Sequence, residues 1–127
     1  MNKNILVIDD EAGIRTSFVL ALEDTGYHVD TAESGEVGVE KEKSKNYNLI
    51  FLDLKMPGMN GVDVLRKIRE GNKKVPIYLV TAFHKEFFAE LKIAIKEGVE
   101  FELLKKPIDS QQILQVVKSV FESSTIY

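Results

Sequence analysis

Polar side chains follow four short hydrophobic runs of the sequence, and their types could do chemistry on a charged substrate. The set consists of Asp9 and Asp10 after ILVI, Asp53 after LIFL, Thr81 after PIYLV, and Lys106 after FELLK. Each run is short and apolar, as buried strands are. Because the carboxyl ends of parallel strands meet at one edge of a sheet, these residues are expected to converge on one crevice. That crevice would hold three carboxylates, a hydroxyl and an ammonium group.

A cluster of carboxylates at one sheet edge favours a metal site. Two carboxylates about 4 Å apart repel by about 4 kcal/mol at an effective dielectric constant near 20, so the cluster needs a cation or raised pKa values. Hard oxygen ligands favour Mg²⁺, which binds one or two carboxylates and shares phosphate oxygens with its substrate. The alternative for Asp9 and Asp10 is a pair of N-cap residues for the following helix, but a cap needs one acid and does not explain Asp53.

Asp53 ends a continuous hydrophobic run and precedes the turn LKMPGMNG. A carboxylate in this position beside Mg²⁺ can attack phosphorus and form an acyl phosphate. The alternative is an acid that caps a helix or stabilises the turn, although Asn60 is the better cap candidate for the next helix. Gly58 and Gly61 are expected to make the turn tight and to let the backbone approach the metal closely.

Lys106 and Thr81 are candidates for binding phosphoryl oxygens. Lys106 precedes Pro107, which holds it in an extended conformation, and its ammonium group acts as a compact point charge. Opposite three acids, this role is favoured over that of a solvated surface lysine. Thr81 offers a hydroxyl donor, although taken alone it is equally well a β-branched strand residue.

Alternating strands and helices are expected to position these residues. Strands are predicted at 5–8, 28–32, 49–52, 76–80 and 101–105. Helices are predicted at 12–22, 35–45, 62–69 and 86–97, and after the N-cap Asp109. The alternation indicates an α/β fold, a flavodoxin-like doubly wound (βα)5 arrangement with a parallel sheet covered on both faces. The second strand alternates in hydrophobicity as an edge strand does, which the strand order 2-1-3-4-5 satisfies.

Composition bounds the class of protein. With 127 residues the chain fits a single domain, 1–127, and 44% hydrophobic residues are enough for a core. A net charge of -3 is not the positive charge that is typical of proteins that bind nucleic acid. The sequence has no cysteine, and no apolar run approaches the roughly 18 residues that span a bilayer. A cytoplasmic protein without nucleic-acid or membrane partners is therefore expected.

The motifs ILVIDD, LIFLDLKMPGMNG, YLVTA and LLKKP occur in this order along the chain. Together they resemble the receiver domain of response regulators in two-component signalling, over nearly the whole length. The resemblance implies that Asp53 accepts a phosphoryl group from the phosphohistidine of a sensor histidine kinase. It also implies that Mg²⁺ is bound by Asp10, Asp53 and the backbone carbonyl of Lys55, with Asp9 assisting through water.

The same resemblance assigns the phosphoryl oxygens to Thr81 and Lys106, and it implies that the Lys106–Pro107 peptide bond can be cis. Such a domain catalyses its own phosphorylation and dephosphorylation and is not otherwise an enzyme. We expect a receiver without an output domain. It would act by binding other proteins or by onward transfer to a downstream phosphotransfer protein or effector.

One position departs from the pattern of the family. Many receivers carry Tyr or Phe three residues before the site lysine, and Leu103 stands there in this chain. Phe101 is the nearest aromatic alternative, so one of these two residues would have to replace the aromatic group of the usual threonine–aromatic switch. Phe83, two residues after Thr81, is expected to shield an acyl phosphate from water.

A partner surface is expected on the first helix. The segment EAGIR at 11–15 resembles the start of this helix in the stand-alone receivers of sporulation phosphorelays. Val19 falls outside the apolar stripe of the helix, and Gly13 would permit close approach of another helix. The face with Ile14, Arg15 and Val19 is hypothesised to dock on the histidine-bearing helical bundle of the kinase. The alternative is that isolated exposed apolar residues are normal on a soluble protein.

Other classes of protein share parts of this pattern. A scaffold-type pseudo-receiver would work unphosphorylated, but the complete set of acids, threonine and lysine speaks against it. A Mg²⁺-dependent aspartyl phosphatase of the haloacid dehalogenase type would need a second acid where Lys55 stands. A flavodoxin-like electron carrier would need a Ser-, Thr- or Gly-rich phosphate loop where DDEAG stands. The sequence therefore favours a phosphoacceptor.

Overall fold

The computed structural model describes residues 3–82 and 85–122 of the chain. In this part, five parallel strands form one sheet in the order β2-β1-β3-β4-β5. The strands are β1 (Asn4–Ile8), β2 (His28–Ala32), β3 (Leu49–Asp53), β4 (Ile77–Thr81) and β5 (Glu102–Lys105). The helices are α1 (Ala12–Leu22), α2 (Gly35–Ser44), α3 (Gly61–Gly71), the 3₁₀ helix η1 (Lys85–Phe87), α4 (Phe88–Lys96) and α5 (Ser110–Glu122). The predicted fold class and strand order are confirmed.

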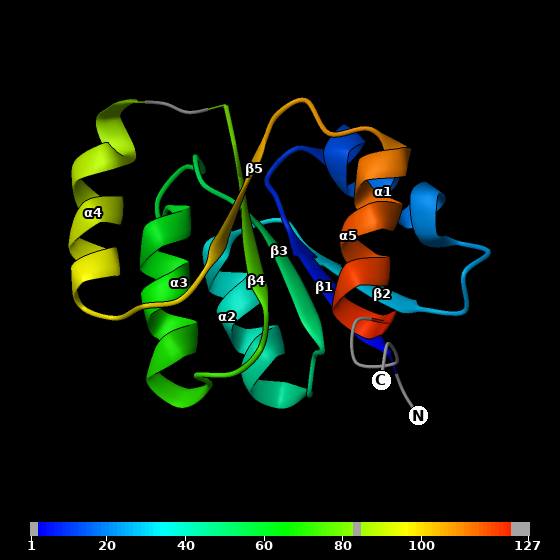
Figure 1. Cartoon of the computed structure of the whole chain (residues 1–127), viewed down its shortest axis with the longest axis horizontal. Coiled ribbons are helices and arrows are strands. Elements are labelled where there is room, and N and C mark those ends of the chain that lie inside the picture. The colour runs from blue at the N-terminus through cyan, green and yellow to red at the C-terminus, as the bar shows by residue number, and fades with distance from the viewer. Residues whose placement is uncertain (1–2, 83–84, 123–127) are drawn as a thin grey trace.

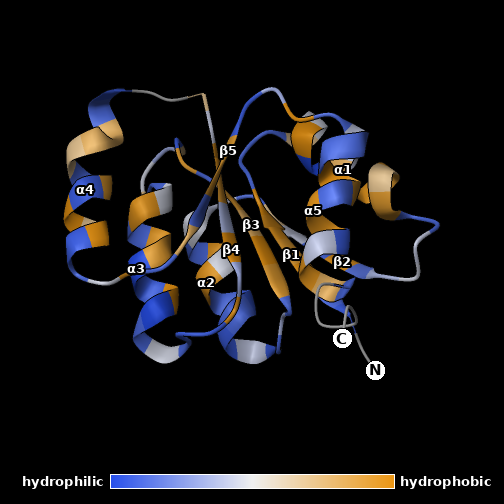
Figure 2. Ribbon diagram, in the orientation of Figure 1, coloured by the Kyte–Doolittle hydropathy of each residue, from blue (hydrophilic) through white to orange (hydrophobic). Residues whose placement is uncertain are grey.

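The sheet is the middle one of three layers (Figure 1). Helices α1 and α5 cover one face, and α2, α3 and α4 cover the other. Side chains alternate between the faces along each strand, so on β1 the residues Ile5 and Val7 join the core under α1 and α5, whereas Leu6 and Ile8 join the opposite core. Hydrophobic residues accordingly concentrate in the central strands and on the sides of the helices that face them (Figure 2).

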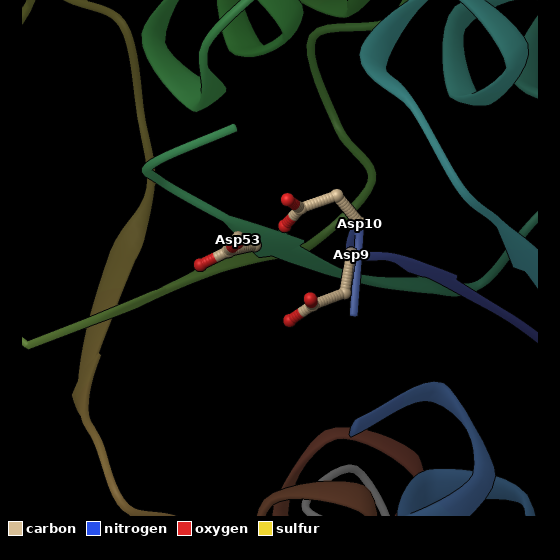
Figure 3. A group of neighbouring side chains, drawn as sticks. All are labelled: Asp9, Asp10 and Asp53. Carbon is tan, nitrogen blue, oxygen red and sulfur yellow. The ribbon is translucent and has the colours of Figure 1, made fainter. Parts of the chain in front are cut away.

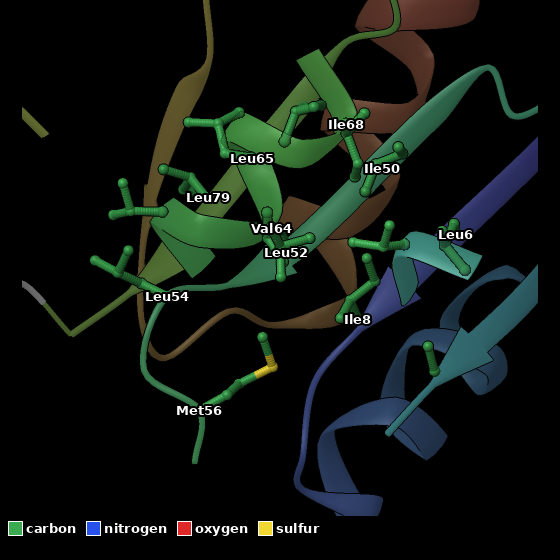
Figure 4. Close-up of a cluster of buried hydrophobic side chains, with 14 of the residues drawn as sticks. Leu6, Ile8, Ile50, Leu52, Leu54, Met56, Val64, Leu65, Ile68 and Leu79 are labelled. Atoms are coloured by element: carbon green, nitrogen blue, oxygen red, sulfur yellow. The ribbon is translucent and has the colours of Figure 1, made fainter. Parts of the chain in front are cut away.

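The larger core cluster lies between the sheet and the helices α2, α3 and α4, and Figure 4 shows the part of it around α3. Leu52 of β3 and Leu65 and Ile68 of α3 are at most 1% exposed in this cluster. Burying a Leu or Ile side chain fully stabilises the fold by about 1.5–3 kcal/mol. Strand β3, which leads to Asp53, is therefore held firmly against α3 on this face of the sheet.

The strands with continuous apolar sequences lie in the centre of the sheet, as predicted. Every residue of β3 is buried, whereas β2 is only partly buried along most of its length and β5 is largely exposed. Strand β2 therefore forms one edge, as its alternating sequence indicated, and β5 forms the other.

Several element boundaries differ by one or two residues from the predicted ones. Strand β3 extends through Asp53 because this residue still pairs with Val80 in the sheet. Strand β4 begins after Pro76, which has no N–H group for the ladder, although its carbonyl accepts a hydrogen bond from the Ile50 N–H at 3.0 Å. The helix predicted at 86–97 is divided into η1 and α4.

Side-chain caps fix the starts of two helices. Asn60 accepts from the Asp63 N–H at 3.0 Å, and the Asp63 carboxylate accepts from the Asn60 N–H at 3.2 Å, which is a capping box. Asp109 and Gln112 make the same reciprocal pair at the start of α5, as predicted. None of the helices in the described part of the chain combines the length and the hydrophobicity needed to cross a membrane.

Candidate functional site

Three carboxylates converge at the carboxyl edge of the sheet, as predicted (Figure 3). Asp9 and Asp10 follow β1, Asp53 ends β3, and these two strands are neighbours in the sheet. One carboxylate oxygen from each residue lies within 4.8 Å of the others. Asp9 and Asp53 are each 3% exposed, whereas Asp10 is exposed. The cluster is thus partly desolvated and remains open to solvent at one residue.

Lys106 reaches the acidic cluster from the end of β5. Its Nζ lies 2.9 Å from Oδ1 of Asp53 and 3.8 Å from Oδ2 of Asp9. The Lys106 N–H donates to the Thr81 carbonyl at 2.8 Å, which ties the loop after β5 to the end of β4. The Lys106–Pro107 peptide bond is cis, as predicted. The ammonium group therefore lies opposite the acids and is not a solvated surface charge.

Thr81 lies beside the same acids and is 2% exposed. A small cavity of about 100 Å³ at this place is lined by Glu11, Asp53, Lys55, Thr81, Ala82 and Lys106. The predicted acceptor Asp53, the Thr81 hydroxyl and the Lys106 ammonium thus share one opening, although they lie at or just after the ends of three different strands. Glu11 and Ala82 were not singled out from the sequence. Their proximity follows from chain adjacency, because they lie next to Asp10 and Thr81.

The electrostatics of the site are dominated by burial and by the crowding of acids. Burial is the largest influence on Asp53 and raises its pKa to about 6, while the hydrogen bond from Lys106 opposes this rise and the Asp9 carboxylate adds to it. Burial also raises the pKa of Asp9. For Lys106, burial is the largest single influence and acts to lower the pKa, but the hydrogen bond to Asp53 and the negative charges of Asp53, Asp9 and Glu11 together outweigh it, so the pKa is raised. A bound cation would relieve the repulsion among these carboxylates.

The alternative roles of the acids do not fit the structure. The N-cap of α1 is Glu11, so Asp9 and Asp10 are not an N-cap pair. Asp9 instead accepts the Glu11 N–H through Oδ1 at 2.9 Å, one step before the helix. Asn60 caps α3, as predicted, which leaves Asp53 free of that role.

Glycine permits a close contact behind Asp53. A Cβ atom on Gly61 would lie 2.6 Å from the carbonyl oxygen of Asp53 and 2.7 Å from Cα of Leu54. Gly58 has φ 74°, a conformation that side chains disfavour. The turn is therefore tight, as predicted. Beside it, Nζ of Lys55 pairs with Oε1 of Glu86 at 3.3 Å and links this turn to η1.

The three residues of the hypothesised docking face behave differently. Val19 is 40% exposed and lies outside the apolar stripe of α1, as expected. Ile14 is half-buried and lines a groove with Phe18, Pro107 and Ile108, next to the acidic site. Arg15 points to the site itself, because its Nη1 donates to the Asp9 carbonyl at 2.8 Å. Sequence reasoning missed this contact, although helical side chains point back toward the N-terminus of their helix.

Leu103, and not Phe101, shares a pocket with Thr81. This apolar pocket, about 280 Å³, is also lined by residues of α4. Leu103 is 44% exposed. Phe101 precedes β5 and packs against the core cluster under α2 and α3. An aliphatic side chain therefore lies beside Thr81, at the position where many receivers carry an aromatic one. Phe83 lies outside the described residues.

A doubly wound sheet with acids after its first and third strands and a lysine after its fifth defines a class of signalling domains. Residues 5–118 match the family described as response regulator receiver domain. The chain belongs to this family and is a receiver domain of two-component response regulators. No observation in the described residues favours the scaffold or phosphatase alternatives over it.

Relatives of known role carry the same domain. The alkaline phosphatase synthesis transcriptional regulatory protein PhoP of Bacillus subtilis is 33% identical over 126 residues, which are 99% of this chain and 51% of that protein. The transcriptional regulatory protein ResD of the same organism is 37% identical over 121 residues, 95% of this chain and 49% of that protein. The chain thus spans about half the length of these relatives.

Solved structures show the same fold. The chemotaxis protein CheY4 of Vibrio cholerae has a TM-score of 0.82 at 25% identity, covering 95% of this chain and all of that one. The response regulator TrrA of Thermotoga maritima, solved in complex with Mg²⁺ and BeF, has a TM-score of 0.77 at 34% identity, covering 94% of this chain and 99% of that one.

The donor set of the acidic cluster fits a divalent cation. Carboxylate oxygens within 4.8 Å of one another are hard ligands at a distance that a small cation can bridge. Receiver domains bind a divalent metal in an acidic pocket of this kind, and Asp9, Asp10 and Asp53 form that pocket here.

Proposed function

We propose that the chain is a phosphoacceptor, in which Asp53 takes a phosphoryl group from the phosphohistidine of a sensor histidine kinase. The single observation that carries this proposal is the contact of 2.9 Å between Asp53 and Lys106 beside a cavity that Thr81 also lines. A carboxylate, a fixed ammonium and a hydroxyl around one opening suit an incoming phosphoryl group, whose negative charge spreads over its oxygens.

In the proposed reaction an oxygen of the Asp53 carboxylate attacks phosphorus. The bond from phosphorus to the donor imidazole nitrogen breaks, its electron pair stays on that nitrogen, and an acyl phosphate forms on Asp53. With a pKa of about 6, Asp53 is mostly ionised at neutral pH and so is available as the nucleophile. Lys106 and Thr81 hold phosphoryl oxygens. Mg²⁺, held by Asp10, Asp53 and the Lys55 carbonyl with help from Asp9, would neutralise charge on the group in transfer.

An intact-mass measurement tests this function. The protein is incubated with a small acyl phosphate donor, with Mg²⁺ or with a chelator, in its wild-type form and as Asp53→Asn. We expect one phosphoryl adduct that requires Mg²⁺ and is lost in the variant. Asp24→Asn, which changes an exposed acid after α1, is the matched control and should keep the adduct. An adduct that persists in Asp53→Asn, or none in the wild type, would rule the proposal out.

Partners and location follow from this role. Response regulators receive their signal from sensor histidine kinases, and the face of α1 with Ile14, Arg15 and Val19 is the proposed docking site for the helical bundle of the kinase. Val19, which is exposed, and the groove beside Ile14 support this choice.

Onward signalling would use a downstream phosphotransfer protein or effector. The domain would act in the cytoplasm and turn over no substrate besides its own phosphoryl group.

A further inference from the structure

One contact of the site is made by a side chain that neither the metal nor the phosphoryl group would touch. The guanidinium of Arg15 extends back from α1 and donates through Nη1 to the backbone carbonyl of Asp9, with an N–O distance of 2.8 Å. Arg15 is half-buried. Hydrogen bonds from a charged donor are worth about 1.5–3 kcal/mol, more than neutral ones. The bond is therefore strong enough to hold the loop after β1.

With this bond, every polar group of Asp9 has a partner. Its N–H donates to the Ala32 carbonyl at 3.0 Å, and Oδ1 accepts from the Glu11 N–H at 2.9 Å. Its Oδ2 lies 3.8 Å from Nζ of Lys106. The remaining polar group of Asp9 is its carbonyl oxygen, which accepts the hydrogen bond from Arg15. This carbonyl is part of the peptide bond between Asp9 and Asp10. Arg15 thus completes the fixation of Asp9.

The peptide bond between Asp9 and Asp10 is planar, so fixing the Asp9 carbonyl also fixes the plane from which Asp10 departs. Asp10 needs this support. Its carboxylate is exposed and makes no hydrogen bond or ion pair with another described residue. The positions that this carboxylate can reach are therefore set by its backbone and its own rotamers, whereas contacts with other residues also hold the carboxylates of Asp9 and Asp53.

We propose that Arg15 is a positioning residue that aims the Asp10 carboxylate into the metal site by holding the Asp9–Asp10 peptide. The inference rests on the proposed function, because it assigns Arg15 to the metal-binding step of that function. It differs from the docking role of α1, since it needs no kinase. Partners that orient metal ligands from outside the ligand set commonly matter for affinity by about 10–100-fold when removed.

The charge of Arg15 and its hydrogen bond to Asp9 predict opposite effects of an Arg15 substitution on Mg²⁺ affinity. Removing a positive charge near three carboxylates should strengthen the binding of a cation, if charge alone decides. Removing the hydrogen bond should weaken binding, because Asp10 then samples orientations away from the metal. The direction of the change in Mg²⁺ affinity therefore separates the two.

The test measures the Mg²⁺ affinity of the full chain by calorimetry for the wild type, Arg15→Ala and Arg15→Lys. We expect about 10-fold weaker binding in Arg15→Ala. Arg15→Lys should recover most of the affinity, because only one donor contacts the carbonyl and an ammonium can replace a single donor. Arg66→Ala is the charge-matched control, since Arg66 lies on α3 and pairs with Glu97 on its surface. The Mg²⁺ affinity of Arg66→Ala should be unchanged or slightly higher than that of the wild type.

Phosphorylation by a small donor provides a second readout. In Arg15→Ala the rate should fall at low Mg²⁺ and approach that of the wild type at saturating Mg²⁺, since the phosphoryl ligands are intact. Unchanged or tighter Mg²⁺ binding in folded Arg15→Ala would overturn the inference, and a loss confined to transfer from a kinase would make Arg15 a docking residue only. Failure of the proposed function looks different: the wild type itself would form no Mg²⁺-dependent adduct.

Discussion

Gly61 shows how one missing side chain allows Asp53 to lie where it does. Its N–H donates to the Leu54 carbonyl at 2.8 Å, and this bond holds the first turn of α3 against the end of β3. The atoms nearest to an added Cβ belong to the backbone of Asp53 and Leu54, which cannot rotate away as a side chain would. Any larger residue at position 61 must therefore displace either α3 or the end of β3 that carries Asp53.

We expect Gly61→Ala to lower the free energy of unfolding by about 1–3 kcal/mol, the usual cost of overpacking, and to slow phosphorylation of Asp53 by a small donor. Gly71→Ala, in the same helix, is the control. No heavy atom lies within 4 Å of its added Cβ, so stability should be unchanged or higher by up to about 1 kcal/mol. Urea unfolding of both variants checks this, and equal losses would contradict the steric explanation.

At the residue scale, the sequence predicts the members of the site but not their supports. Asp53 and Lys106 are recognisable because each follows a hydrophobic run, and the position of a strand end can be inferred from sequence. Arg15 is different, because its role depends on the path that one flexible side chain takes. Whether Leu103 or Phe101 stands beside Thr81 likewise needed the register of β5, which pairs Leu103 with Leu79.

At the scale of elements, β2 is an edge strand that a side-chain network supports. Asp30 accepts hydrogen bonds from the Tyr47 hydroxyl at 2.7 Å and from Nζ of Lys45 at 2.9 Å, and His28 lies 3.1 Å away. Burial is the largest single influence and acts to raise the pKa of Asp30, but the hydrogen bonds from Tyr47 and Lys45 and the nearby positive charge together outweigh it, so the pKa lies below its usual 3.8. The network therefore joins β2 to the segment between α2 and β3.

We expect Tyr47→Phe to destabilise the protein by about 1 kcal/mol at neutral pH, because Asp30 loses a donor. Since the pKa of Asp30 is lowered on folding, the stabilisation is present above the usual value of 3.8 and is lost as the pH falls through the lower, folded value. The difference from the wild type should accordingly shrink in strong acid.

Urea unfolding across a pH series measures that difference. Tyr78→Phe is the control, because the Tyr78 ring packs beside Phe51 and its hydroxyl has no hydrogen bond to another described residue. A loss in Tyr47→Phe that stays constant down to strong acid would show that the bond to Asp30 is not its cause.

Element type and order were predictable, whereas some boundaries were not. The spacing of hydrophobic residues along the sequence distinguishes strands from helices, and strands that are hydrophobic on both faces are identified as the central ones. The end of β3 at Asp53 depends on pairing with Val80, which is a tertiary contact. The division of the fourth helix at Phe87 is likewise a matter of local geometry that periodicity cannot resolve.

At the scale of the whole molecule, the metal site exists only in the folded state. Asp10 and Asp53 are far apart in sequence, and the adjacency of β1 and β3 is what brings them together. The sequence predicted this convergence because the fold class places all carboxyl ends at one edge. An unfolded chain has no such cluster, so binding of a cation is coupled to folding.

Mg²⁺ should therefore stabilise the protein against unfolding. A ligand that binds only the folded state adds about 2.7 kcal/mol at 100 times its Kd, and removal by a chelator should reverse the gain. Thermal unfolding over a series of Mg²⁺ concentrations measures this, at constant ionic strength maintained with NaCl. If NaCl alone, at the same ionic strength, raised the stability as much as Mg²⁺ does, the effect would be charge screening and would not indicate a specific metal site.

Asp53→Asn tests whether the acidic cluster is the source of that gain. In a chelator the variant should be more stable than the wild type, because it removes a buried carboxylate whose pKa is raised to about 6, and each unit of such a shift corresponds to about 1.4 kcal/mol. In Mg²⁺ it should gain less, because a ligand is lost while Lys106 keeps an oxygen to bind. The difference between the two proteins in the free energy of unfolding should thus become smaller or change sign as Mg²⁺ is added. An equal gain in both would place the cation outside the cluster of Asp9, Asp10 and Asp53.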